Sequence, residues 1–338
     1  MNPSTMRCTR TAGGRAHRSP WLFMPLVLLL AACGSGSGGD GGQPALPASA
    51  LCVSDACGEA VELFAIPEAE NTAVSPDGRL FVAADNLYEV VAGADGTLER
   101  VTRAQGQGSF FNGMVVDRGM LYAIRGDELT AARLDDPDFA LQVIAPLSGF
   151  VIPNGMTVDA QHRLYISDGP VPLTPKIERF ILAEDDPLTV TGRETWLTDG
   201  LLAPNGLDVA MVDGRELLFF TDDGTLSVNQ VEITPDGSPG EVQRLLTRAT
   251  FFDDLKYYDG HLLVTDFLRG TVLLMDLDGE VLQETAPMSF IGPTSVQVSD
   301  GRLLPAGELF VTSRGVQFET LTGLGDALSV FRTKGNQP

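Results

Sequence analysis

The chain repeats one unit six times, and this repeat restricts the fold more than any other feature of the sequence. A unit opens with a run such as Asn154-Gly-Met-Thr-Val-Asp and continues to a second apolar run such as Leu164-Tyr-Ile-Ser-Asp168. The units begin at residues 70, 112, 154, 205, 253 and 294, with spacings of 42, 42, 51, 48 and 41 residues. A period of about 40 to 50 residues, with short strands in each unit, is typical of β-propeller blades.

The two ends of the repeat predict how the ring of blades closes. Turns such as Pro76-Asp77-Gly78 separate the strands within a unit. The sixth unit ends after residues 327–332 without an outer strand, whereas residues 60–66 precede the first unit and have no partner there. We therefore predict an all-β, six-bladed β-propeller in which 60–66 pairs with 327–332 and closes the ring. A β-sandwich is the main alternative, and it does not explain six near-equal repeats.

The N-terminal segment has the composition of a secretory signal peptide. Residues 1–32 carry four arginines and no acid before the apolar run 21–32, which is too short for a spanning helix. The following Leu30-Ala31-Ala32-Cys33-Gly34 resembles the lipobox of bacterial lipoproteins. The resemblance implies an exported protein lipidated at Cys33, attached to the membrane by the lipid anchor only, at the periplasmic face of the outer membrane. A cleavage site followed by an incidental cysteine is the alternative.

Residues 33–58 are expected to form a flexible tether before the propeller, which would occupy 59–338. The run 34–42 is rich in glycine and serine and cannot bury a core. It matches Gly-x-Gly-x-x-Gly, but no strand precedes it and no helix follows, which excludes a dinucleotide site. Cys52 and Cys57 lie close together in a chain expected in an oxidising compartment, so we predict a local disulfide.

The chain is strongly acidic, and this excludes some partners. Removal of the four arginines with residues 1–32 would change the formal net charge from −22 to −26. Such a surface repels nucleic acid and anionic headgroups and attracts cations, although simple solubility is the alternative explanation. Nothing in the sequence fixes the oligomeric state.

The six leading positions of the repeat all carry an oxygen-bearing side chain. They are Glu70, Asn112, Asn154, Asn205, Asp253 and Thr294. Each is expected to begin an innermost strand, so together they ring one mouth of the central channel. Two carboxylates with several amide oxygens suit calcium better than zinc or iron, and we expect one catalytic-type ion, with a second, structural ion left open. Asn-Gly is also a common turn pair, but turn chemistry does not explain the glutamate.

The repeated Asn-Gly-Leu or Asn-Gly-Met with an isolated glutamate in the first unit resembles the senescence-marker-protein, gluconolactonase and paraoxonase group of six-bladed, calcium-dependent hydrolases. The resemblance covers residues 60–332. It implies that Glu70, Asn154, Asn205 and Asp253 hold calcium and that Asp253 is also the general base. Asn112 takes the place of a second-blade asparagine that contacts substrate or metal.

Three departures from the group weaken the case for a sugar substrate more than the case for a metal. Phe110 stands where sugar-lactone members have an arginine. Glu70-Asn71-Thr72 replaces the group's Glu-Gly-Pro, and Asp254 rather than glycine follows Asp253. Histidine is not expected at the site, because His162 and His261 follow their leading residues by eight positions, about 25 Å along an extended strand. The base must then be Asp253, another carboxylate or hydroxide held by the metal.

Apolar residues precede the leading positions and are expected to form the wall of the mouth. Phe110, Phe111 and Phe252 are therefore predicted to bind substrate together with Asn112. Such a wall favours a fairly hydrophobic small-molecule ester or lactone, although packing between blades explains each phenylalanine equally well. A further set of acids ends the second strands and is expected to support the site or to cap loops: Asp85, Asp168, Asp222 and Asp266.

The sequence thus favours a calcium-dependent hydrolase acting on a fairly hydrophobic lactone or ester at the channel mouth. The alternative is a non-catalytic, calcium-stabilised propeller that serves as a tethered binding or scaffold module. A third possibility resembles strictosidine synthase, a propeller without the calcium ligand set, and Glu70 and Asp253 argue against it.

Overall fold

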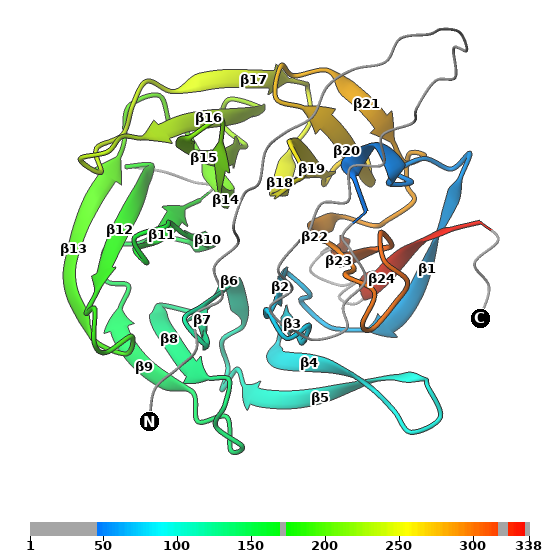
Figure 1. Ribbon diagram of the computed structural model, residues 1–338, viewed down its shortest axis with the longest axis horizontal. Helices are drawn as coiled ribbons and strands as arrows, with labels where there is room; N and C mark the ends of the chain where they lie inside the picture. Colours follow the sequence, from blue (N-terminus) through cyan, green and yellow to red (C-terminus); the bar gives the residue numbers. More distant parts are fainter. Residues whose placement is uncertain (1–45, 170–173, 317–323, 335–338) are drawn as a thin grey trace, which may run out of the picture. The chain divides into compact units, whose positions relative to one another are not determined.

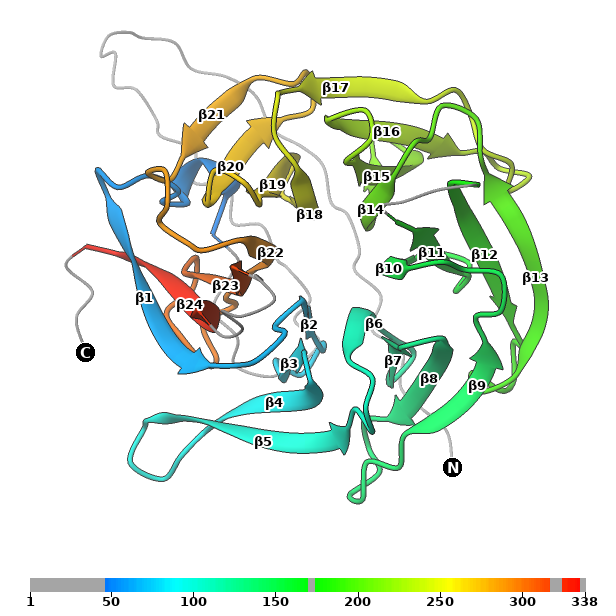
Figure 2. The same ribbon diagram turned by 180° about the vertical axis from the view of Figure 1, so that it is seen from behind.

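The computed structural model describes residues 46–169, 174–316 and 324–334, and these form six four-stranded antiparallel sheets. The sheets are the six blades of a β-propeller, as the repeat predicts (Figures 1 and 2). The one helical element of the described chain is a short 3-10 turn, η1 (Ala48–Ala50). In this part of the chain no helix has the length and apolar composition that a bilayer span requires.

Each blade runs from an inner strand at the channel to an outer strand. The first three blades are β2 (Asn71–Val74), β3 (Leu80–Ala83), β4 (Asn86–Ala92), β5 (Leu98–Gln105); β6 (Phe111–Asp117), β7 (Met120–Arg125), β8 (Glu128–Arg133), β9 (Gln142–Pro146); and β10 (Pro153–Val158), β11 (Leu164–Asp168), β12 (Lys176–Leu182), β13 (Val190–Leu197). The last three are β14 (Pro204–Val212), β15 (Arg215–Asp222), β16 (Ser227–Ile233), β17 (Gln243–Thr247); β18 (Phe252–Tyr258), β19 (His261–Asp266), β20 (Thr271–Asp276), β21 (Val281–Glu284); and β22 (Pro293–Val298), β23 (Leu309–Val316), β24 (Leu324–Thr333), β1 (Gly58–Ala65).

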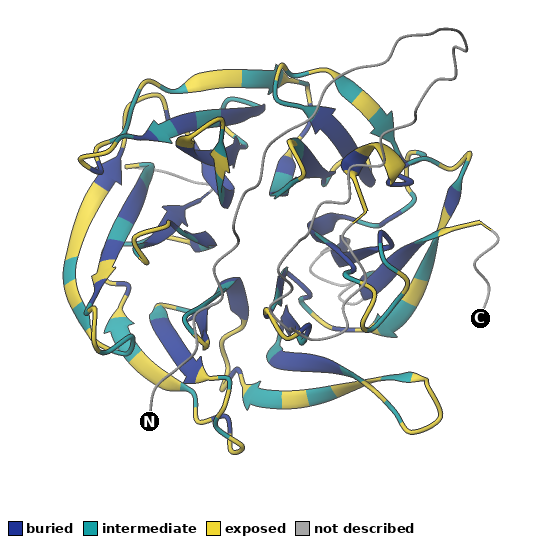
Figure 3. Ribbon diagram, in the orientation of Figure 1, coloured by how far each residue is buried: buried dark blue, intermediate teal, exposed yellow. Residues whose placement is uncertain are grey.

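Burial falls from the inner strands to the outer ones (Figure 3). All four residues of β3 are buried, because both faces of this strand pack against neighbouring blades, and its sequence is a continuous apolar run. The outer strand β5 instead mixes exposed with partly buried residues. One apolar cluster fills each junction between neighbouring blades, so the core is distributed around the ring.

The ring closes as predicted. Strand β1 pairs antiparallel with β24, from Gly58 opposite Thr333 to Ala65 opposite Ala327. The inner strands β22 and β2 also contact each other, as do all the other neighbouring inner strands. The N-terminal strand is therefore the outer strand of the sixth blade, and the prediction for residues 60–66 is confirmed.

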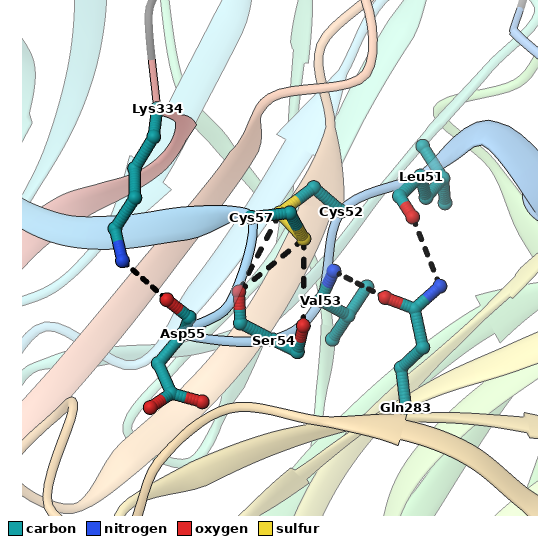
Figure 4. Close-up of a disulfide and its surroundings, with 8 residues drawn as sticks. All are labelled: Leu51, Cys52, Val53, Ser54, Asp55, Cys57, Gln283 and Lys334. Carbon is teal, nitrogen blue, oxygen red and sulfur yellow. Dashed lines mark hydrogen bonds between the residues drawn. A yellow bond between two sulfur atoms is a disulfide. The ribbon is translucent and has the colours of Figure 1, made fainter.

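The segment before β1 differs from the predicted tether, because residues 46–57 pack onto the propeller. Leu51 and Val53 are buried in the apolar cluster between the fifth and sixth blades. The backbone N–H of Val53 donates to Gln283 Oε1 at 2.9 Å, and Gln283 Nε2 donates to the Leu51 carbonyl at 3.0 Å (Figure 4). The buried side chains of Leu51 and Val53 and these two hydrogen bonds thus help to dock the segment on the propeller.

The Cys52–Cys57 disulfide stands directly before β1, with its Cα atoms 5.9 Å apart (Figure 4). It ties the docked segment to the first residues of the closing strand. Cys33 and the predicted signal peptide 1–32 lie outside the described residues, as does the first half of the predicted tether, 33–45.

Candidate functional site

A cavity of about 410 Å³ lies at the mouth where the inner strands begin. Its walls come from the first and the third to sixth blades, and they consist of Glu70, Asn154, Ala203, Asn205, Asp223, Gly224, Phe251, Asp253, Phe267 and Arg314. All four predicted calcium ligands are among them. A larger groove of about 870 Å³ between β1 and the β4–β5 turn contains none of the predicted site residues.

A shift in strand register accompanies the leading residues in five of the blades. In β14, Pro204 is opposite Asp222 and Leu207 is opposite Phe220, so Asn205 lies within the irregular step. The same irregularity occurs in β6, β10, β18 and β22, whereas β2 pairs regularly with β3. Bulges of this kind redirect a side chain out of the strand's alternation. They allow the leading side chains to reach the channel.

A hydroxyl on the second strand replaces the ladder hydrogen bond at this irregularity. In the fourth blade, the Gly206 N–H donates to Thr221 Oγ1 at 2.9 Å, and the Thr221 hydroxyl donates to the Asp253 carbonyl of the next blade at 2.6 Å. Hydroxyls that make this double contact in four blades are named here the bridging hydroxyls: Ser167, Thr221, Thr265 and Thr312. Their acceptors in the next blade are the backbone carbonyls of Asn205, Asp253, Thr294 and Glu70.

The glycine after each leading asparagine reflects close packing rather than a turn. A Cβ atom on Gly206 would lie 2.4 Å from the Cα of Asp254, and one on Gly155 would lie 2.3 Å from the carbonyl oxygen of Asn205. Both glycines lie inside inner strands. Only a residue without a side chain lets the next inner strand pass this closely, so turn chemistry does not account for the Asn-Gly pairs.

The cavity encloses several carboxyl groups that perturb one another. Burial raises the pKa of Asp253 well above its ordinary value, and the nearby charges of Glu70, Asp223 and Asp254 raise it further. Burial likewise raises the pKa of Asp223 to about 7 and that of Asp254 to about 7. The pKa of Glu70 is also raised, mainly by burial, although Arg314 opposes the shift. The cluster therefore has more negative charge than this environment stabilises.

Arg314 is the one cationic side chain on the wall of this cavity, within the described residues. Its Nη1 donates to Glu70 Oε2 at 2.9 Å, and its Nη2 lies 2.8 Å from Glu68 Oε2. The guanidinium also stacks over the ring of Phe110, 4.7 Å from the centroid. One oxygen of the predicted ligand Glu70 is thus engaged by an arginine.

Asp223, Phe267 and Arg314 were not predicted, although one repeat position accounts for all three. Each is near the end of its blade's second strand or just after it. Its backbone N–H donates at 2.9 Å to the carbonyl of the residue two positions before a leading residue. The three pairs are Asp223 with Ala203, Phe267 with Phe251, and Arg314 with Gly292. The same position holds glycine in the second and third blades. Comparison of the six repeats at this position, as well as at the leading one, would have found them.

Three of the acids that end the second strands cap loops. Asp168 Oδ1 accepts the N–H groups of Val151 and Ile152 at 2.8 and 2.9 Å. Asp222 does the same for Leu202 and Ala203. Asp266 behaves similarly, since it accepts from Arg269 N and Thr250 Oγ1, whereas Asp85 accepts from the side chains of Asn86 and Tyr88 on β4. These contacts fix the loops of the cavity wall.

None of the four predicted substrate-binding residues is part of the cavity lining. Phe111 and Phe252 are fully buried in the clusters between blades, because the residue directly before a leading position points sideways into the neighbouring blade. The residue one step earlier faces the mouth instead: Phe251 lines the cavity, and Phe110 supports Arg314. Asn112 is buried and donates through Nδ2 to the Pro153 carbonyl at 2.7 Å, and it is not part of the cavity lining, although its Oδ1 is also buried without a hydrogen-bond partner.

The donor atoms of the cavity fit a hard cation. Asn205 Oδ1 and Asp223 Oδ1 are buried and have no hydrogen-bond partner. Such oxygens, with the carboxylates of Glu70 and Asp253, are the ligands that calcium prefers. The described residues contain no group of three or more histidine, cysteine, aspartate and glutamate side chains placed to hold a metal. The candidate set is of a different type, because it combines two carboxylates with two amides.

Neither described histidine lies in the cavity. His162 occupies the β10–β11 turn and contacts Asp117, and His261 begins β19, both at the ends of the strands away from this mouth. The expectation from their spacing is therefore confirmed.

Comparison with known proteins supports the fold. No family model and no curated protein sequence matches the chain. Among solved structures, a gluconolactonase from Xanthomonas campestris is 15% identical, with a TM-score of 0.62 over 87% of this chain and 99% of that one. Regucalcin from Agrobacterium tumefaciens, described as a calcium-binding protein, is 16% identical, with a TM-score of 0.61 over 81% and 92%.

The same fold also supports a different chemistry. The PQQ-bound aldose sugar dehydrogenase of Streptomyces coelicolor is 16% identical, with a TM-score of 0.54 over 83% of this chain and 99% of that one. At these identities the likeness establishes the propeller, and the function must be argued from the cavity.

Proposed function

We propose that the protein is a calcium-dependent hydrolase that acts on a fairly hydrophobic ester or lactone in the mouth cavity. The observation that carries this proposal is that two carboxylates and two amides, Glu70, Asp253, Asn154 and Asn205, line one cavity together with Phe251 and Phe267. When bound, calcium would supply a Lewis acid for the carbonyl oxygen of the substrate.

Asp253 is the proposed general base, because it lines the cavity and no described histidine does. Its carboxylate would take a proton from water as the water oxygen bonds to the carbonyl carbon. The bond from that carbon to the leaving alkoxide then breaks, and the alkoxide takes the proton back from Asp253. Glu70, Asn154 and Asn205 would hold the cation with their side-chain oxygens.

The cavity wall favours an acyl or aryl group over a sugar. Its volume of about 410 Å³ suits a small molecule, and Phe251, Phe267 and Ala203 give it an apolar side. Phe110, at the position of the arginine in sugar-lactone enzymes, supports Arg314 from below rather than offering a hydrogen bond. We therefore expect little turnover of sugar lactones.

The proposed location is the periplasmic face of the outer membrane, with a lipid on Cys33 as the anchor. Its support is the lipobox-like run 30–34 in the sequence. Labelling of cells with a radioactive fatty acid tests it: the protein should take up label, and Cys33→Ser should not. Label on both proteins, or on neither, would contradict the assignment.

The enzymatic proposal is tested by assaying the purified chain on aryl esters and lactones of increasing acyl length, with calcium and with chelator. We expect calcium-dependent turnover that improves with acyl length. If calcium stabilises the fold but no ester or lactone is turned over, the calcium-stabilised binding module is the better description. If calcium changes neither stability nor turnover, both descriptions are wrong.

A further inference from the structure

Large exposed apolar side chains gather on one face of the propeller, around the cavity mouth. They come from loops that join second to third strands or outer to inner strands, and all these loops lie on the mouth face. We define the apolar rim as the exposed members of this set: Phe110, Val151, Ile152, Leu202, Phe251, Leu268 and Met288. The other exposed large apolar side chains among the described residues lie within strands or before β1, towards the opposite face: Leu46, Val143, Ile181, Met211 and Leu282.

The rim is continuous with the cavity and passes from blade to blade. Phe251 belongs to both. Leu202 lies beside the next loop, because a Cβ atom on Gly224 would be 2.4 Å from the Cβ of Leu202. Met288 lies beside the Leu268 loop, since its N–H donates to the Arg269 carbonyl at 2.9 Å. The rim residues therefore lie on neighbouring loops beside the cavity mouth, from the second to the sixth blade.

Exposed carboxylates show the opposite distribution. In the described mouth-face loops only Asp127 and Asp199 are exposed acids. The turns of the other face carry an exposed acid in most blades, for example Asp77, Asp138, Asp213 and Asp278. The mouth-face loops are thus richer in exposed apolar side chains, and the turns of the other face are richer in exposed acids.

We propose that the apolar rim docks onto the surface of a lipid bilayer, with the cavity mouth facing the lipid. Interfacial binding grows with the apolar area that enters the region between headgroups and acyl chains. The acidic turns would stay on the water side, where they avoid anionic headgroups. A fluid bilayer adapts to side chains on several neighbouring loops, whereas a protein partner would need a surface that matches them. This docking does not depend on catalysis in the cavity.

The test measures binding of the chain, expressed from residue 33 with Cys33→Ser, to pure phosphatidylcholine vesicles by flotation, with chelator present. The Cys33→Ser change excludes attachment through a lipid anchor. Leu268→Asp and Met211→Asp form a matched pair, because both side chains are 56% exposed and lie on opposite faces. We expect Leu268→Asp to lower the partition coefficient about tenfold, as loss of one buried leucine implies, and Met211→Asp to leave it unchanged. Thermal unfolding of both variants checks that each is folded.

Binding through apolar contacts should persist at high salt and should not increase on anionic vesicles. Absence of vesicle binding by the parent chain, or equal losses for Leu268→Asp and Met211→Asp, would overturn the proposal. A parent chain that is dimeric in solution, becomes monomeric with Leu268→Asp and ignores vesicles would show that the rim binds a second copy instead.

Discussion

The inner strands of the third to sixth blades differ from those of the first two, although all derive from the same repeat. In the third to sixth blades a bridging hydroxyl joins each irregular step to the next inner strand, as Thr221 joins Gly206 to Asp253. In the second blade the equivalent position is Ile124, which packs in an apolar cluster, and β2 of the first blade has no irregular step. The acceptors of the bridging hydroxyls include the backbones of Asn205, Asp253 and Glu70.

The cavity follows this division. Asn154, Asn205 and Asp253 come from blades with a bridging hydroxyl, and Glu70 is held by the hydroxyl of Thr312. Asn112, from the second blade, turns to the Pro153 carbonyl and takes no part in the lining. An oxygen side chain at the leading position is therefore not sufficient for a site. A fixed backbone is not sufficient either, because Thr294 accepts from the bridging hydroxyl of Thr265 but donates its own hydroxyl to the Ala69 carbonyl and lies outside the lining.

The largest expected effect concerns the proposed base. Asp253→Asn keeps an oxygen ligand and loses basicity, so turnover should fall by about 100-fold or more, while calcium still raises the unfolding temperature. Steady-state kinetics and thermal unfolding measure the two effects. Asn112→Ala, on the side without bridging hydroxyls, should change turnover much less. Wild-type rates for Asp253→Asn would show that another group is the base.

Glu70→Gln should weaken calcium rather than abolish chemistry. Loss of one ligand charge should lower the calcium affinity by about tenfold or more, with activity partly recovered at high calcium. Isothermal titration gives the affinity directly. An unchanged affinity would mean that Glu70 does not bind calcium and only pairs with Arg314, whose Nη1 lies 2.9 Å from Glu70 Oε2.

Removal of a bridging hydroxyl should destabilise the propeller and weaken calcium binding together. Thr221→Val leaves both the Gly206 N–H and the Asp253 carbonyl without their partner, at a cost of about 1 to 3 kcal/mol. Thr130→Val is the matched control, because Thr130 is also fully buried but bonds only the Ala123 carbonyl, within the second blade. Urea denaturation and calcium titration should separate the two. If Thr221→Val and Thr130→Val changed the calcium affinity equally, the bridging hydroxyls would not be what holds the calcium ligands in place.

A further effect concerns the pH dependence of the free energy of unfolding without calcium. The pKa of Asp223 is about 7 in the folded protein against 3.8 ordinarily, so the folded state holds a proton that the unfolded state releases between these values. The free energy of unfolding should therefore rise as the pH falls from about 8 towards 5, and Asp254 adds in the same direction.

Saturating calcium should reduce or reverse this slope, because protons and calcium compete for the same carboxylates. Asp223→Asn should flatten the slope in chelator, whereas Asp199→Asn, an exposed mouth-face residue, should leave it unchanged. Thermal unfolding between pH 5 and about 8 measures how the free energy of unfolding changes with pH. A slope of the opposite sign for the parent chain in chelator would contradict the burial of these acids.

The features that could be predicted from the sequence are those that recur in every unit of the repeat. Strand 60–66 and its partner 327–332 followed from counting strands, and the leading oxygens followed from aligning the units. The neighbouring positions did not follow, because the irregular step changes the direction of successive side chains, so Phe111 and Phe252 enter the core while Phe251 faces the mouth.

Other parts of the site and fold carry little signal in any single segment. Arg314 and Asp223 share a repeat position that holds glycine in two blades, so neither marks a local motif. Leu51 and Val53 are only two apolar residues in a segment whose overall composition is that of a linker. Their burial depends on the cluster between the fifth and sixth blades, whose other buried members, apart from Cys52, lie more than 200 residues away in the sequence, from Leu263 to Phe331.

The most direct test of the central claim is a crystal structure of the protein grown with calcium. We predict a cation with oxygens of Glu70, Asn154, Asn205 and Asp253 at about 2.3 to 2.6 Å, and with Arg314 displaced from Glu70 towards Glu68. A cavity that binds no ion at saturating calcium, with the Arg314–Glu70 ion pair still in place, would contradict the claim.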